Sequence, residues 1–123
     1  MVIDTGIFIE YLRIKDKTAS VLYKIPDNSS LFLSAISMYE LHIGATSAEK
    51  EKDIRVLTES ISVLPFTDDV AIRSARIYHQ LKTANQLIEF RDIFIAATCL
   101  VNDLPILTLN KKHFQRVKGL KII

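Results

Sequence analysis

The chain has 123 residues, of which 49% are hydrophobic and 24% charged, an ordinary composition for a globular protein. This length predicts a single domain, residues 1–123, that is large enough to bury an apolar core. The formal net charge of +2 is too small to indicate a nucleic-acid partner by itself.

Cysteine usage and hydropathy predict a cytoplasmic protein. The lone Cys99 excludes an internal disulfide, which fits a reducing compartment. No apolar run reaches the roughly 18 residues that a membrane-spanning helix needs. The N-terminus lacks a basic start and is interrupted by Asp4 and Glu10, so no signal peptide is expected.

Short apolar runs alternate with helical patterns, which predicts an α/β fold. We expect strands at Met1–Asp4, Leu31–Ser34, Ser62–Pro65, Ile106–Leu109 and Leu120–Ile123. Between them we expect helices at Ile7–Leu12, Lys17–Ile25, Ile36–Gly44, Ala48–Ser60, from Asp68 or Asp69 to about Thr83, at Asp92–Asn102 and at Lys111–Gln115. The stretch Thr83–Arg91 is expected to be a loop. Strands separated by helices favour a central parallel sheet, here of about five strands, with helices on both faces. Ligands gather beyond the carboxyl ends of such strands, where Asp4 and Asn110 fall.

Three acids stand in apolar surroundings that disfavour a charge. Asp4 closes the first apolar run, Glu40 lies within a mostly apolar helical stretch, and Asp92 opens the apolar run Ile93–Ala97. A carboxylate against apolar surface costs free energy unless it is paired, hydrogen-bonded or bound to a cation. The pattern therefore predicts one shared acidic pocket.

Each acid also has a purely structural explanation. Asp4 could cap a helix, Asp92 could interact with a helix dipole, and Glu40 could be a buried glutamate paired with an Arg or Lys. Ile36 and Ile43 are predicted to share the face of Glu40, which a surface glutamate would avoid. Asn110 could simply be a turn residue.

Oxygen ligands suit a hard cation such as Mg²⁺, which keeps several waters and needs only a few carboxylates. Other chemistries lack their residues: the sequence contains no Gly-rich phosphate loop, no zinc-ligand spacing and no nucleophile elbow. Thr108 and Ser34 are expected to offer hydroxyls to the same pocket. The sequence therefore predicts a metal-assisted hydrolase site.

Four segments, in the right order and spread over the whole chain, resemble the motifs of the PIN domain family. They are Asp4–Ile9, similar to a "DTN-hydrophobic" opening; Ser34–Leu41, followed by Gly44; Arg91–Thr98, similar to "D-x-x-I-A-A"; and Leu107–Phe114, similar to "T-x-N/D-x-x-x-F". Each motif alone is only moderately specific. Short chains of this kind resemble the VapC toxins of type II toxin–antitoxin systems.

The resemblance implies a Mg²⁺- or Mn²⁺-dependent endoribonuclease with an RNA substrate. Asp4 and Asp92 would hold the metal, Glu40 would position the metal or the attacking water, and Asn110 would complete the catalytic set. The resemblance also implies a homodimer and a cognate VapB-like antitoxin encoded next door. The antitoxin, rather than this chain, would bind operator DNA. A groove near Tyr11, Leu12 and the helix Lys17–Ile25 is the expected antitoxin site.

Two residues depart from the family pattern. Asn110 stands where many members have Asp, and its neutral amide weakens any second metal site. Gly6 replaces the usual Asn near Asp4. Two alternatives stay open: an RNA-processing nuclease outside toxin–antitoxin regulation, and a non-catalytic module that binds RNA or protein. A phosphoacceptor receiver domain is disfavoured, because its acids would cluster early in the chain.

Overall fold

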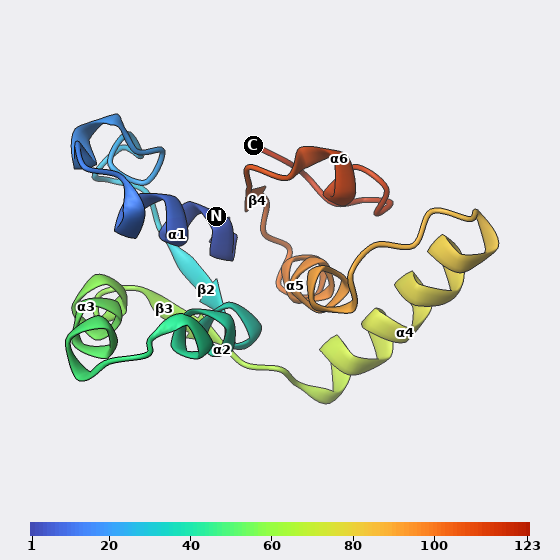
Figure 1. The fold of residues 1–123 in the computed structure, drawn as a ribbon. Helices are drawn as coiled ribbons and strands as arrows, with labels where there is room; N and C mark the ends of the chain where they lie inside the picture. The colour runs from blue at the N-terminus through green and yellow to red at the C-terminus, as the bar shows by residue number, and fades with distance from the viewer.

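The structure, a computed structural model, describes all residues 1–123 and forms one parallel sheet flanked by helices (Figure 1). The strands are β1 (Val2–Ile3), β2 (Phe32–Ser34), β3 (Ser62–Leu64) and β4 (Ile106–Leu107). The helices are α1 (Thr5–Arg13), α2 (Ala35–Gly44), α3 (Ala48–Thr58), α4 (Asp68–Thr83), α5 (Phe90–Val101) and α6 (Lys111–Phe114), with a 3₁₀ turn η1 at Lys17–Ala19. All strand pairs are parallel, in the order β3-β2-β1-β4. The predicted α/β class is confirmed.

The predicted count of about five strands is slightly wrong, because the sheet has four. The segment Leu120–Ile123 contributes only an isolated bridge between Ile106 and Ile122. Gly119 turns the chain with a φ of 80° just before this segment. Beyond Leu107 the chain leaves the sheet for α6, so the last residues have no longer strand to pair with.

The helix predicted at Lys17–Ile25 is also wrong, because only the 3₁₀ turn at its start forms. Side chains capture the backbone groups that a helix would use. The Ser20 hydroxyl donates to the Lys17 carbonyl at 2.6 Å, and the Val21 amide donates to the Glu10 carboxylate at 2.7 Å. Such side-chain bonds compete with helical ones.

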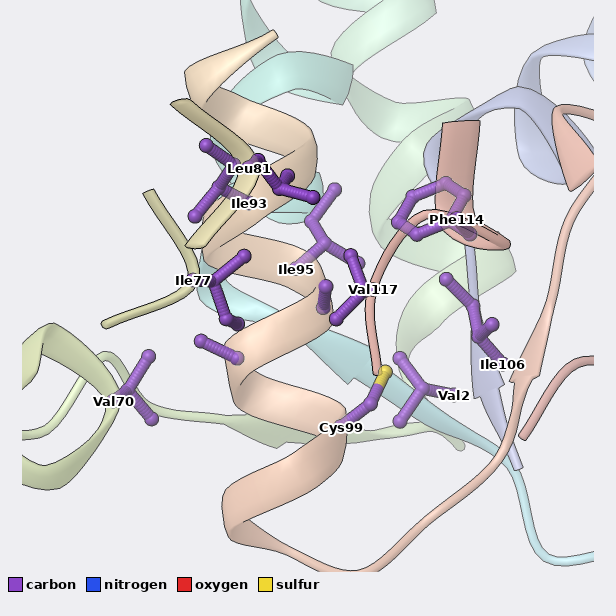
Figure 2. Packing of buried hydrophobic residues seen from close by; sticks show 12 residues of the cluster. Val2, Val70, Ile77, Leu81, Ile93, Ile95, Cys99, Ile106, Phe114 and Val117 are labelled. Atoms are coloured by element: carbon purple, nitrogen blue, oxygen red, sulfur yellow. The ribbon is translucent and has the colours of Figure 1, made fainter. Parts of the chain in front are cut away.

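Helices cover both faces of the sheet, as predicted (Figure 1). Successive strand residues point to opposite faces. Val2 therefore joins the apolar cluster beneath α4 and α5, whereas Ile3 joins the cluster beneath α1 and α3. Figure 2 shows the first cluster, with α5 packed between the side chains of α4 and those of β1 and β4. None of the helices combines the length and apolar content needed to cross a membrane.

Candidate active site

Asp4 is fixed at the carboxyl end of β1, at the edge where β4 also ends. Its side chain caps α1 by accepting a hydrogen bond from the Thr5 amide at 2.9 Å. Because β1 pairs with β4, Thr108 lies next to it, and the Thr108 hydroxyl donates to Asp4 Oδ2 at 2.6 Å. The structural explanation of Asp4 as a cap is correct, yet each carboxylate oxygen keeps a second lone pair for a ligand.

Glu40 is held by a chain of hydroxyl groups that starts at the end of β2. The Thr5 hydroxyl donates to Glu40 Oε1 at 2.8 Å, and it also lies 2.8 Å from the Ser37 hydroxyl. The Ser34 hydroxyl in turn donates to Ser37 at 3.2 Å. A hydroxyl has one proton, so if Thr5 donates to Glu40, Ser37 must donate to Thr5. These three buried hydroxyls orient one carboxylate.

The second oxygen of Glu40 faces Arg91, whose Nε lies 3.8 Å away. Glu40 therefore forms the predicted ion pair and also belongs to the acidic group. The predicted apolar face around Glu40 is partly wrong, because Tyr39 and Ile43 are both exposed. Glu40 is held through Thr5, rather than by an apolar stripe around it.

Asp92 lies in the first turn of α5, and 21% of its side chain is exposed. Its Oδ2 lies 3.5 Å from His113 Nδ1 of α6. Ala96 and Cys99, which are small and follow Asp92 on α5, are fully buried in the apolar cluster. They allow close helix packing.

Asn110 is exposed and contacts no site carboxylate directly. Its amide nitrogen lies 2.7 Å from His113 Nδ1, the ring nitrogen that faces Asp92. Its backbone amide donates to the Thr108 hydroxyl at 2.9 Å, the same hydroxyl that donates to Asp4. Asn110 therefore contacts His113 and the Thr108 hydroxyl, which in turn contact the carboxylates of Asp92 and Asp4.

The acids are close enough to perturb one another. The pKa of Asp4 is raised to about 6, mainly by burial and additionally by the charges of Asp92 and Glu40, against the lowering effect of the hydrogen bonds from Thr108 and Thr5. Burial also raises the pKa of Asp92; His113 lowers it, and the charge of Glu40 adds to the increase. Charges that repel one another in this way favour a cation between them.

The arrangement fits a hard cation with few protein ligands. Its donors are carboxylate oxygens, and the pKa of Asp4 is raised first by burial and then by the neighbouring charges of Asp92 and Glu40, both of which a bound cation would offset. No three His, Cys, Asp or Glu side chains converge tightly enough to hold a metal by themselves. The residues therefore suit Mg²⁺ or Mn²⁺ that keeps water or takes substrate oxygens, and they do not form a closed cage.

Sequence reasoning missed four residues that the structure brings to the site: Thr5, Ser37, Arg91 and His113. All four lie inside the motif segments but were not singled out. The spacing of Ser34 and Ser37, three residues apart at a helix start, is a capping pattern that could have identified Ser37. His113 and Arg91 gave no such signal, because their partners are distant in sequence.

Comparison with known proteins gives the chain its relatives. The family model for the PIN domain matches residues 1–120. Ribonuclease VapC10 of Mycobacterium tuberculosis is 31% identical over 121 residues, covering 98% of this chain and 90% of that protein. Ribonuclease VapC1 of Methanocaldococcus jannaschii is 28% identical, covering 99% of this chain and 85% of that protein.

A solved structure agrees with this assignment. The VapBC-1 structure from nontypeable Haemophilus influenzae superimposes with a TM-score of 0.84 at 27% identity, covering 99% of this chain and 95% of that chain. Sequence motifs and fold thus point the same way. The chain belongs to the PIN domain family, and its relatives there are VapC ribonucleases.

Proposed function

We propose that this chain is a metal-dependent endoribonuclease, the toxin of a VapBC-type toxin–antitoxin pair, which hydrolyses RNA phosphodiester bonds. The observation that carries the proposal is that Asp4 after β1, Glu40 on α2 and Asp92 on α5 lie near one another, with burial and then the charges of Asp92 and Glu40 raising the pKa of Asp4. The names of the relatives support the ribonuclease activity.

Asp4 and Asp92 would hold a Mg²⁺ or Mn²⁺ ion, with Glu40 positioning the metal or the attacking water. When bound, the ion supplies an activated water and neutralises charge on the phosphodiester. Asn110 occupies the fourth motif position, but its amide faces His113. A neutral amide used in this way favours one metal rather than two.

The residues of the chain itself orient the acids and limit access of water. Thr108 and the Thr5 amide fix Asp4, so its free lone pairs keep one direction. The hydroxyls of Thr5 and Ser37 do the same for Glu40. Ile93 and Ile95, which follow Asp92 on α5, belong to a buried apolar cluster that excludes solvent. Groups held in place before reaction lower its free-energy barrier.

The proposed partner is a small VapB-like antitoxin, since one similar solved structure is that of VapBC-1. A groove of about 490 Å³ between α1, α2 and α3 is a fitting site for it. The groove reaches Glu40 and is lined on its apolar side by Ile9, Leu12 and Leu41. Of the residues expected at the antitoxin site, Leu12 lines this groove, whereas Tyr11 and Lys17–Ile25 do not. We further propose a cytoplasmic homodimer that reaches operator DNA only through the antitoxin.

The proposal is tested by incubating the purified chain with mixed cellular RNA in Mg²⁺, in Mn²⁺ and in chelator. Asp4→Ala and Asp92→Asn are the site variants. Asp103→Asn is the matched control, because Asp103 is an exposed acid just beyond the opposite end of α5.

We expect metal-dependent cleavage by the wild type and Asp103→Asn, and a loss of at least about 100-fold in both site variants. Equal cleavage by all four proteins would indicate a contaminating nuclease and remove the support for the acidic site. Absence of cleavage, together with no Mg²⁺ or Mn²⁺ binding at millimolar concentration, would favour a non-catalytic module.

A further inference from the structure

The guanidinium group of Arg91, which faces Glu40 in the acidic site, lacks part of its hydrogen-bond partners. It precedes Asp92 in the first turn of α5. Its Nε lies 3.5 Å from Glu89 Oε2 and 3.8 Å from Glu40 Oε2, both beyond the length of a good hydrogen bond. That nitrogen is buried without a hydrogen-bond partner, although 40% of the side chain is exposed. A donor group in this position has unused bonding capacity.

Arg91 is the permanently charged side chain that pairs with the acids of the site. Asp4, Glu40, Glu89 and Asp92 all lie within this group, as their mutual effects on pKa indicate. Apart from His113, no other basic side chain forms an ion pair with any of them. An RNA phosphate that approaches four carboxylates is repelled unless a cation receives it. Arg91 supplies a positive charge that does not depend on a bound metal.

Three aromatic side chains that pack on one another hold Arg91 beside the acids. The guanidinium carbon lies 5.8 Å from the centroid of the Phe90 ring, within the range of a cation–π contact. Phe90 packs edge-to-face on Phe94 at 5.8 Å, and Phe94 does so on Phe66 at 5.1 Å. The guanidinium is thus positioned through its stacking, while its hydrogen-bonding edges stay incompletely used.

We infer that Arg91 is a substrate-binding residue whose guanidinium exchanges the carboxylates of Glu40 and Glu89 for a phosphate of single-stranded RNA beside the acidic site. The inference rests on the proposed ribonuclease function and adds a contact to it. Half-exposed ion pairs at such distances stabilise a fold little, so the exchange costs little. A phosphate accepts two parallel bonds from a guanidinium, a geometry that neither carboxylate offers here.

The contact has a signature in the salt dependence of RNA binding. Binding of a fluorescent, mixed-sequence single-stranded RNA pool would be measured from low to moderate salt, in chelator, on an Asp92→Asn background that keeps the RNA intact. Adding Arg91→Ala is expected to weaken binding about tenfold. It should also reduce the slope of log K against log salt by about 0.7, the value for one phosphate contact on a single strand.

Two variants separate charge from geometry and from general effects. Arg91→Lys keeps the charge, so its slope should stay at the value of the parent while affinity falls in part. Arg76→Ala is the matched control, because Arg76 is an exposed helical arginine on α4 without an ion pair. It should change neither affinity nor slope.

Metal binding distinguishes a substrate contact from a structural role. Arg91→Ala in the otherwise wild-type chain should bind Mn²⁺ at least as tightly as the wild type, because a positive charge beside Glu40 is removed. If Arg91 served mainly to hold Glu40 in place, Mn²⁺ binding would weaken, and this result would overturn the inference.

The inference also fails if Arg91→Ala keeps the affinity and slope of its parent, or if no protein binds the RNA pool. These outcomes are separate from failure of the proposed function. If the wild type cleaves no RNA but Arg91→Ala still weakens salt-dependent RNA binding, the phosphate contact is supported. Only the nuclease assignment is then lost.

Discussion

Asp4 carries its charge at a cost to the stability of the fold. In the unfolded chain this carboxyl has a pKa of about 3.8, whereas burial raises the folded pKa to about 6. The folded state therefore holds the proton more tightly than the unfolded state does. Its contribution to stability is complete below pH 4 and is lost as the pH rises to 6 and beyond. At neutral pH the loss amounts to about 3 kcal/mol.

Asp4→Asn is therefore expected to be more stable than the wild type at pH 7.5 without divalent metal. The amide cannot ionise, so the variant avoids the cost of a buried charge. The gain should be about 1–3 kcal/mol at pH 7.5 and should shrink towards pH 4.5. Urea denaturation of both proteins at the two pH values measures the difference.

Divalent metal provides the control for this experiment. Millimolar Mg²⁺ should raise the stability of the wild type at pH 7.5 and leave Asp4→Asn nearly unchanged, because a ligand of the folded state stabilises it by mass action. If the stability difference between the two proteins is the same at both pH values, the raised pKa is refuted.

Most of the candidate site residues that the sequence indicated stand at an element boundary, and Glu40 inside α2 is the exception. Asp4 and Asp92 stand next to apolar runs, and Asn110 follows a strand, so local patterns marked all three. The contact between Asp4 and Thr108 joins residues 104 positions apart and depends on which strands are neighbours. Sequence order does not fix the spatial order of strands, so Arg91 and His113 could not be assigned their carboxylates.

At the scale of elements, α2 shows how end signals make a helix predictable. Ser34 caps its start by accepting from the Ser37 amide at 3.0 Å, and Gly44 is its last residue. The predicted helix Ile36–Gly44 therefore differs from α2 by one residue. The segment Lys17–Ile25 has equally helical composition, but Glu10 from α1 binds its Val21 amide. A tertiary contact of that kind cannot be predicted from the local sequence.

Gly44 offers a test of the groove, because a Cβ added at this position would have no atom within 4 Å. Gly44→Ala should stabilise the chain by about 0.5–1 kcal/mol, since glycine loses more backbone entropy than alanine in a helix. Gly44→Arg should place a long side chain in the groove lined by Leu12 and Leu41 and weaken antitoxin binding by about tenfold or more. Thermal unfolding and titration with the neighbouring gene's antitoxin measure these effects.

The alanine variant serves as the matched control for the arginine variant. It changes the same position without filling the groove, so it should retain antitoxin binding. The alanine variant should also cleave RNA at the wild-type rate. Tight antitoxin binding by Gly44→Arg would move the antitoxin site elsewhere on the surface.

At the scale of the whole molecule, several large apolar side chains remain exposed, among them Phe66, Ile72 and Phe90. Exposed apolar groups that pack on one another, as Phe66 and Phe90 do through Phe94, are typical of interaction surfaces. We expect a homodimer, with a solution mass twice the 14.0 kDa of one chain. Sedimentation velocity over a range of concentrations checks it; a single-chain mass throughout would contradict it.

The late position of β4 in the chain also determines the order in which the site is assembled. Asp4 is synthesised 104 residues before its partner Thr108. A nascent chain that has reached only Val101 has the three acids and lacks β4, the hydroxyl on Asp4 and the imidazole beside Asp92. The complete site therefore forms only after β4 and α6 have been synthesised, and any shorter nascent chain carries the acids without the side chains that hold them.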